Sequence, residues 1–211
     1  MIIGKTTFLT ALLVFSMLLS FGQKFVFYLH GAIIENQGPN AVDTINGFGA
    51  YKYSDILDSL KKRKCTVISE VRKPNTAIKD YAEVVAKQID SLLKKKINPE
   101  NITVIGASKG SVIAMYVSTI VKNKDVNYVF MAACTDGLFA SDPDILFYGN
   151  ILSIYEKSDF RGSCIKFKNK SKTINHYKEI EINTGLRHGF LYRPISEWMD
   201  PVTKWINNDY K

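Results

Sequence analysis

The chain has 211 residues, of which 46% are hydrophobic and 23% charged, a composition typical of one folded domain and not of a disordered chain. Lys and Arg outnumber Asp and Glu by 28 to 20, but the basic residues gather in short runs at 61–64 and 94–96. Such runs are typical of solvated helix ends, so we expect no nucleic-acid partner. The three cysteines, Cys65, Cys134 and Cys164, include no Cys-x-x-Cys pair, and together with three histidines they offer no zinc-ligand spacing.

The first 22 residues have the pattern of a secretory signal. Lys5 precedes an apolar stretch over residues 7–19, and small residues lie at Ser20 and Gly22. The apolar stretch is shorter than the roughly 20 residues that a membrane span needs, which disfavours the alternative of a membrane anchor. We therefore expect a cleaved signal peptide at residues 1–22, a single domain over residues 23–211, and secretion or export to the periplasm with no stable membrane anchor.

Short apolar runs alternate with helical patterns along the rest of the chain. The runs have the composition of strands that are buried on both faces. They cover residues 24–30, 66–71, 101–106, 126–133, 150–155 and 177–182. Apolar residues at three- and four-residue spacings predict helices over residues 78–93 and 112–120, and further helices are expected near 52–62, 163–171 and 196–208. The alternation predicts an α/β protein, a three-layer α/β/α sandwich around a mostly parallel sheet of about six strands. Ligands bind such sheets at the carboxyl ends of the strands.

The turn after the third expected strand carries Ser108 in the pattern Gly106-Ala107-Ser108-Lys109-Gly110, between a strand and a helix. In this nucleophile elbow, the serine takes a strained backbone conformation that holds its hydroxyl above the sheet. The flanking glycines leave room for the helix and a neighbouring strand to pass closely. Ser108 is therefore the candidate nucleophile, and the alternative is that it only caps the following helix.

A serine hydroxyl needs a histidine to accept its proton and a carboxylate to orient that histidine. Asp159 follows the fifth expected strand and His188 follows the last one, so both belong at the edge of the sheet that carries Ser108. Glu156 competes with Asp159 for the carboxylate role, and a purely structural role is the alternative for His188. We expect the triad Ser108, Asp159 and His188.

An oxyanion hole needs two backbone amides aimed at the developing negative charge. Lys109, directly after the nucleophile, supplies the first. The first strand ends in His30-Gly31-Ala32, which is similar to the His-Gly motif that precedes the oxyanion residue in some hydrolases, and Ala32 supplies the second.

Together, His30-Gly31, the Gly-x-Ser-x-Gly turn, Asp159 and His188 resemble the α/β-hydrolase family over residues 24–211. The resemblance implies a serine hydrolase that cleaves a small-molecule carboxylic ester through an acyl-enzyme, without a cofactor or a metal. Unlike larger members, the chain enters at the strand that carries His30-Gly31 and has no cap domain between residues 133 and 150. A minimal fold with an open site follows, which suits small esterases, acylglycerol lipases and carbohydrate-ester deacylases.

Four further residues have two roles open to them. Glu35 and Arg72 are candidates for facing the substrate, and the alternative is that they pair with each other and brace the loop after the first strand. Cys134 and Cys164 each follow a strand that we expect to be adjacent in the sheet, so a disulfide between them can form in an oxidising compartment. Cys65 lies at the opposite end of its strand and is expected to stay a thiol.

Two other functions compete with ester hydrolysis. Residues 104–110 resemble the dinucleotide loop of short-chain dehydrogenases, but Val112 replaces the third glycine, and no tyrosine is followed four residues later by a lysine. The second alternative is a binding protein that keeps the hydrolase fold and has lost turnover, because a fold does not guarantee an activity.

Overall fold

A computed structural model describes residues 22–211. The expected signal peptide lies outside the described residues apart from its last residue, Gly22. Within the described part of the chain, every helix is too short or too polar to cross a bilayer.

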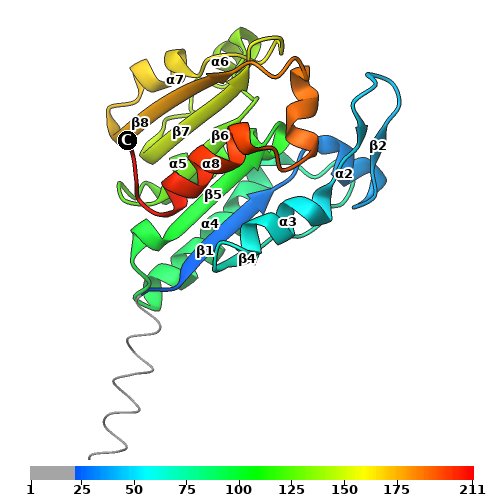
Figure 1. The fold of residues 1–211 in the computed structure, drawn as a ribbon. Helices are drawn as coiled ribbons and strands as arrows, with labels where there is room; N and C mark the ends of the chain where they lie inside the picture. Colours follow the sequence, from blue (N-terminus) through cyan, green and yellow to red (C-terminus); the bar gives the residue numbers. More distant parts are fainter. Residues whose placement is uncertain (1–21) are drawn as a thin grey trace, which may run out of the picture.

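Six parallel strands form the central sheet, in the order β4-β1-β5-β6-β7-β8 (Figure 1). Their bounds are β1 (Lys24–Leu29), β4 (Cys65–Ile68), β5 (Ile102–Ala107), β6 (Asn127–Met131), β7 (Tyr148–Glu156) and β8 (Thr173–Ile182). A separate antiparallel hairpin consists of β2 (Val42–Asp43) and β3 (Gly49–Ala50). The sheet confirms the parallel arrangement expected from the alternation of strands and helices.

Helices cover both faces of the sheet, which gives the expected three layers (Figure 1). One face carries α3 (Tyr53–Lys61) and α8 (Ser196–Ile206), and the other carries α4 (Ile78–Lys94) and α5 (Lys109–Val121). The shorter helices are α2 (Ala32–Gln37), α6 (Asp136–Ser141), α7 (Ile165–Lys170) and the 3-10 turns η1 (Pro99–Asn101) and η2 (Arg187–Tyr192). The carboxyl ends of the strands point toward α2 and η2, so the loops that carry the candidate residues gather at that edge (Figure 1).

The core follows the two-residue period of the strands. On β1, Val26 and Tyr28 pack into the cluster that contains Trp198 of α8, while Phe27 and Leu29 pack into the cluster of α4 and α5. Successive side chains of a strand point to opposite faces, so a strand covered by helices on both sides must be apolar at every position. This is why the strand segments appear in the sequence as continuous apolar runs.

Several details differ from the sequence-based expectation. Helices α2 and α6 each have six residues, too few for an apolar period to become visible. Strand β4 ends at Ile68 instead of Val71, because the chain leaves the sheet and the Arg72 amide donates to His30 Nε2. Strand β8 begins at Thr173, four residues earlier than expected, because it pairs with β7 along that strand's whole length.

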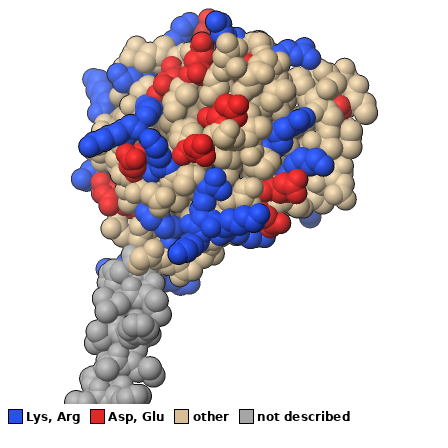
Figure 2. All heavy atoms as spheres, in the orientation of Figure 1, with Lys and Arg blue, Asp and Glu red and all other residues tan. Residues whose placement is uncertain are grey.

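Charged side chains of both signs are interspersed on the face that carries α3 and α8, with a denser run of basic side chains along its lower edge (Figure 2). Some lysines are paired with neighbouring carboxylates, such as Lys61 with Asp58 on α3. Exposed pairs of this kind contribute little to stability and keep the surface solvated.

A disulfide joins Cys134, after β6, to Cys164, before α7, with a Cα–Cα distance of 5.2 Å. The Gly162 amide also donates to the Cys134 carbonyl at 3.0 Å, so the two segments are held together twice. Cys65 is a free, half-buried thiol. The bridge therefore closes the segment of chain that contains Asp159.

Removing this disulfide should destabilise the fold. A bridge with a sequence separation of 30 restricts the unfolded chain and contributes about 3 to 4 kcal/mol in the loop-entropy model. We expect the double variant Cys134→Ser, Cys164→Ser to lose about that much free energy of unfolding in urea titrations. Cys65→Ser is the matched control. Reduction should raise the intact mass of the wild type and of this control by about 2 Da, because the reduced bridge takes up two hydrogens, and should leave the mass of the double variant unchanged. Unchanged mass on reduction would exclude the bridge.

Candidate active site

Ser108 lies in the sharp turn between β5 and α5, with φ 54° and ψ −118°. A non-glycine residue with positive φ is uncommon and costs on the order of 1–3 kcal/mol, which the surrounding structure must supply. The Ser108 amide donates to the Met131 carbonyl of β6 at 3.0 Å, and the Ser108 carbonyl accepts from the Ser111 amide at 2.8 Å. These bonds hold the strained conformation that the nucleophile elbow requires.

The two glycines of the elbow are required by close backbone contacts. A Cβ atom on Gly106 would lie 2.3 Å from the Ser111 Cα of α5, and one on Gly110 would lie 1.9 Å from the Leu29 carbonyl oxygen of β1. Both distances are far below van der Waals contact, so any side chain would push the helix or the strand away. The helix and the neighbouring strand that the motif predicts at close approach are therefore α5 and β1.

Ala32 and Lys109 are the first residues of α2 and α5. The first amides of a helix have no partner within that helix, and the helix dipole adds partial positive charge there. The loop before α2 lies against the elbow, since a Cβ on Gly31 would be 3.5 Å from Ser108 Cβ. Two helix N-termini thus meet beside the serine, the arrangement that an oxyanion hole needs.

His30 orients one of these amides. Its Nδ1 lies 2.8 Å from the Gly31 carbonyl oxygen and its Nε2 accepts from the Arg72 amide at 3.1 Å, which fixes the neutral ring with the proton on Nδ1. The Gly31 carbonyl and the Ala32 amide belong to one planar trans peptide, so they point in opposite directions. Fixing the carbonyl therefore fixes the direction of the Ala32 N–H.

His188 and Asp159 form a close pair, with 2.5 Å between His188 Nδ1 and Asp159 Oδ2. The Asp159 side chain is 2% exposed and that of His188 is 16% exposed. Burial raises the pKa of Asp159, but the hydrogen bond from His188 and the Arg161 amide outweigh it and hold that pKa below its usual value. Asp159 is therefore ionised near neutral pH, and the contact through Nδ1 leaves His188 Nε2 to accept a proton.

Glu156 occupies a different position from Asp159. Its fully buried carboxylate accepts hydrogen bonds from the Ser158 amide at 2.6 Å and from the Thr184 and Gly185 amides, both at 3.0 Å. The first amide belongs to the loop of Asp159 and the other two to the loop of His188. Glu156 thus joins the two loops, and Asp159 is the carboxylate that contacts the histidine.

Ser108 and His188 line one open pocket of ≈ 330 Å³. Its walls come from the loop before α2, from the hairpin and from η2; they include Gly31, Ala32, Ile33, Ile45, Asn46 and Leu191. The elbow, the histidine and the N-terminus of α2 therefore face one common space. The part of the chain that the structure describes contains no cluster of side chains suited to bind a metal ion.

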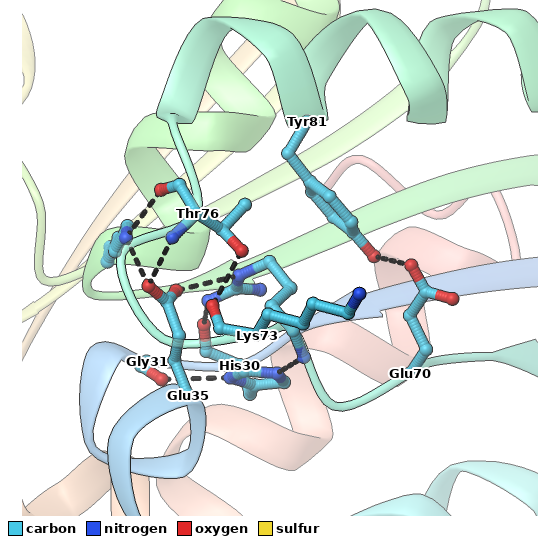
Figure 3. Close-up of polar contacts among 9 residues, drawn as sticks. His30, Gly31, Glu35, Glu70, Lys73, Thr76 and Tyr81 are labelled. Atoms are coloured by element: carbon cyan, nitrogen blue, oxygen red, sulfur yellow. Dashed lines mark hydrogen bonds and ion pairs between the residues drawn. The ribbon is translucent and has the colours of Figure 1, made fainter.

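Figure 3 shows an ion network around Glu35, beside His30 and Gly31. Glu35 of α2 accepts from Arg72 Nε at 3.1 Å, from Lys109 Nζ at 2.6 Å and from the Thr76 amide at 3.0 Å. Burial raises the pKa of Glu35, but the hydrogen bonds from Lys109 and Arg72 hold it below its usual value. The Glu35 carboxylate thus connects α2, the loop after β4 and the start of α5.

Of the two roles open to Glu35 and Arg72, facing the substrate is contradicted by the structure. Their side chains are 2% and 1% exposed and bonded to each other, and neither lines the pocket. An unpaired buried charge would be far more costly than this pair, so each residue requires the other. Of the two roles that the sequence left open, the structure shows the brace.

Sequence reasoning missed two contributors to this site. Thr76 takes part in the Glu35 network through its backbone, which leaves no sequence signal. Phe48, in the turn of the hairpin, packs against the His188 ring, with 6.5 Å between ring centroids, and the hairpin itself was not expected. The sequence signals for this turn are the Asn46-Gly47 pair, which is typical of hairpin turns, and Gly49; both glycines have positive φ.

No protein-family model matches this sequence, and no curated protein matches it. Solved structures do match along most of the chain. A truncated carbohydrate esterase from gut microbiota is 14% identical with a TM-score of 0.59, over 89% of this chain and 86% of its own. A YdeN-like hydrolase from Pectobacterium atrosepticum is 10% identical with a TM-score of 0.56, over 94% of this chain and 98% of its own. SOBER1 from Arabidopsis thaliana is 13% identical with a TM-score of 0.52, over 90% of this chain and 100% of its own.

These neighbours have the α/β-hydrolase fold, and so does this chain. The likeness confirms the expected fold and counts against the dehydrogenase alternative. At this level of identity it concerns the fold alone, and the chemistry of the site depends on the residues described above.

His30 should make the protein sensitive to mild acid. Burial, together with the nearby Arg72 charge, lowers the pKa of His30 to about 4 from 6.5. His30 binds a proton near pH 6.5 in the unfolded chain but only near pH 4 in the folded chain. The neutral ring therefore contributes its full stability above pH 6.5, and this contribution is lost as the pH falls from 6.5 to 4. We expect wild type to lose about 2 to 3 kcal/mol more than His30→Gln between pH 7 and 4.5 in urea titrations. If the free energy of unfolding fell equally with pH in both proteins, the lowered pKa of His30 would be wrong.

Glu156→Gln should loosen the loops that carry Asp159 and His188, without changing either of these two side chains. The amide NH2 group places donors where the carboxylate accepted from backbone N–H groups, which costs about 1–3 kcal/mol. We expect a matching fall in the free energy of unfolding and loss of the low-field proton resonance of His188 Nδ1. Glu83→Gln, an exposed glutamate on α4, is the control and should retain both. A sharp His188 resonance in Glu156→Gln would show that Glu156 does not position the histidine.

Proposed function

We propose that this α/β-hydrolase-fold chain is a serine hydrolase that cleaves carboxylic esters. The observation that carries the proposal is the convergence of three features on one pocket: the strained Ser108 elbow, the His188–Asp159 pair at 2.5 Å and two helix N-termini. Each feature alone has a structural explanation, but their convergence supports acyl transfer. The esterases among the structural neighbours support the same class of reaction.

In the proposed reaction, His188 Nε2 accepts the proton of Ser108 as the hydroxyl oxygen attacks the ester carbonyl. The ionised Asp159 orients the ring and stabilises the imidazolium that forms. His188 then gives the proton to the departing alkoxide, and the alcohol leaves behind an acyl-Ser108. Water, deprotonated by His188, attacks the acyl group, and the proton returns to Ser108 as the acid departs.

The negative charge on the carbonyl oxygen is stabilised by the amides of Ala32 and Lys109. These donors are in place before the reaction, since His30 orients the Ala32 peptide and the Glu35 network connects the two helices. That network contains two cations, Arg72 and Lys109, against one carboxylate, so its net charge is positive. Preorganised donors of this kind account for about 10²–10³-fold in turnover each.

The substrate of the proposed enzyme is a small ester. The pocket has no covering domain between β6 and β7, where the described chain has only the short helix α6 and its loops. Its lining combines apolar Ile33, Ile45 and Leu191 with polar Asn36 and Asn46, which suits a compact acyl group next to a polar alcohol. No step of the proposed mechanism needs a cofactor.

The proposed enzyme is exported, with residues 1–22 as a cleaved signal peptide. The pattern of Lys5, the apolar stretch and the small residues before Gln23 supports this. The disulfide between Cys134 and Cys164 supports it independently, because such bridges persist mainly in oxidising compartments.

Labelling with a fluorophosphonate probe, followed by peptide mapping, tests the proposed nucleophile. We expect modification at Ser108 in the folded protein and none after heat denaturation or in His188→Ala. Ser108→Ala should lower ester turnover by at least about 10⁴-fold while the thermal midpoint stays near wild type. Ser91→Ala, a serine on the exposed surface of α4, is the matched control. An unlabelled folded protein would instead favour the binding protein that has lost turnover.

A further inference from the structure

A second cavity of ≈ 450 Å³ adjoins the active-site pocket. The two cavities share the lining residues Asp43, Asn46, Arg161, His188 and Tyr192, so they adjoin each other at the histidine. The second cavity is also lined by Asp159, Phe48 and Phe160, but not by Ser108. It therefore lies on the histidine side of the site, away from the nucleophile.

Two arginines line this second cavity from different loops, Arg161 after β7 and Arg187 after β8. The guanidinium carbon of Arg161 lies 4.1 Å from the Phe160 ring centroid, and that of Arg187 lies 5.1 Å from the Phe48 ring centroid. Arg187 also donates to the Asn46 carbonyl at 3.0 Å. Stacking on an aromatic ring restricts a guanidinium and leaves its edge N–H groups available for a ligand.

Neither arginine is neutralised by a close ion pair. Among the described residues, no carboxylate lies within ion-pair distance of Arg187, and Arg161 is 4.0 Å from Asp159 Oδ1, the limit of such a contact. The Arg161 side chain is 30% exposed, and Arg187 is exposed. Both guanidinium groups are therefore accessible from the cavity.

The two carboxylates in the cavity wall are already engaged. Asp43 is buried and accepts from the Asn46 amide at 2.7 Å, from the Asn46 side chain at 2.9 Å and from the Tyr192 hydroxyl at 3.2 Å. Asp159 is buried against His188. Both carboxylates of the wall are thus buried and hydrogen-bonded, and the arginines are its more exposed charges.

The proposed reaction determines which part of an ester reaches this cavity. His188 gives its proton to the departing alkoxide, so the alcohol portion must lie on the histidine side when the carbonyl carbon is at Ser108. From there, the alcohol portion extends into the cavity that Arg161 and Arg187 line.

We infer that Arg161 and Arg187 bind an anionic group, a carboxylate or a phosphate, on the alcohol portion of the ester substrate. A planar guanidinium donates two parallel hydrogen bonds to a carboxylate or a phosphate. Two guanidinium groups from separate segments of the chain can therefore bind the same anionic group. This inference rests on the proposed ester hydrolysis and adds the class of substrate to it.

The test compares esters that share an acetyl group and differ in the charge on the alcohol: para-acetoxybenzoate, para-acetoxyphenyl phosphate and the neutral methyl ester of para-acetoxybenzoate. Each kcat/KM is divided by the rate constant of hydroxide-catalysed hydrolysis of the same ester, which removes differences in intrinsic reactivity. We expect at least one anionic ester to exceed the neutral ester by about ten-fold or more in wild type. The anionic ester with the higher normalised kcat/KM relative to the neutral ester shows whether the site prefers a carboxylate or a phosphate.

The variant Arg161→Gln, Arg187→Gln should reduce that ratio to about one, since neutral amides cannot replace the charge–charge attraction. The ratio is informative even if overall turnover falls, because both esters share the same catalytic groups. Lys157→Gln is the control: it removes a cation from the loop after β7 that does not line the cavity, and the ratio should stay at the wild-type value.

The two possible failures have different signatures. If Ser108 is labelled and the neutral ester is cleaved, but wild type shows no preference or the double variant keeps it, the anion site is wrong and the hydrolase proposal stands. If folded wild type neither reacts with the fluorophosphonate probe nor cleaves any of the three esters, both proposals are wrong.

Discussion

The buried carboxylate of Glu35 is the interaction on which the geometry of the site depends. It binds Arg72, Lys109 and the Thr76 amide, and so connects α2, the loop after β4 and the first residue of α5. Desolvating three charged groups is costly, and an apolar cluster of the same volume could give similar stability. What an apolar cluster could not do is fix direction, because dispersion contacts are not directional, whereas hydrogen bonds to a carboxylate are.

On the side of the site that carries Asp159 and His188, a buried carboxylate again connects separate loops. Glu156 accepts backbone amides from the loops of Asp159 and His188, and the disulfide between Cys134 and Cys164 closes the first of these loops at its far end. Each half of the candidate site therefore has a buried carboxylate that gathers loops from separate strands. Loops are the least restrained part of a parallel sheet, so a site assembled from them needs such cross-connections to keep its groups in place.

Between these two braces lies the strained residue Ser108, and Ala132 after β6 and Arg187 before His188 are two further non-glycine residues with positive φ beside the site. The positive φ of Ser108 is compensated by bonds to β6 and within α5, and the glycines on either side allow β1 and α5 to approach closely. The same compactness brings two helix N-termini together next to the hydroxyl. The strained turn and the pair of amides thus result from how closely β1, β5 and β6 and their helices pack, whereas the His188 imidazole is restrained by the loops after β7 and β8.

The sequence by itself determined the order of strands and helices, the parallel sheet, and the positions of Ser108, Asp159 and His188 after their strands, because these follow from local apolar periods and from turn residues. It left open whether Glu35 and Arg72 face a ligand, and it showed Glu156 only as a rival for Asp159. Tertiary structure decided these points, since the partners of Glu35 and Glu156 come from loops far away in the chain, and many are backbone amides that carry no residue signature. The short α2 and the β2–β3 hairpin were likewise decided by packing, because elements of six and two residues are too short to have a period.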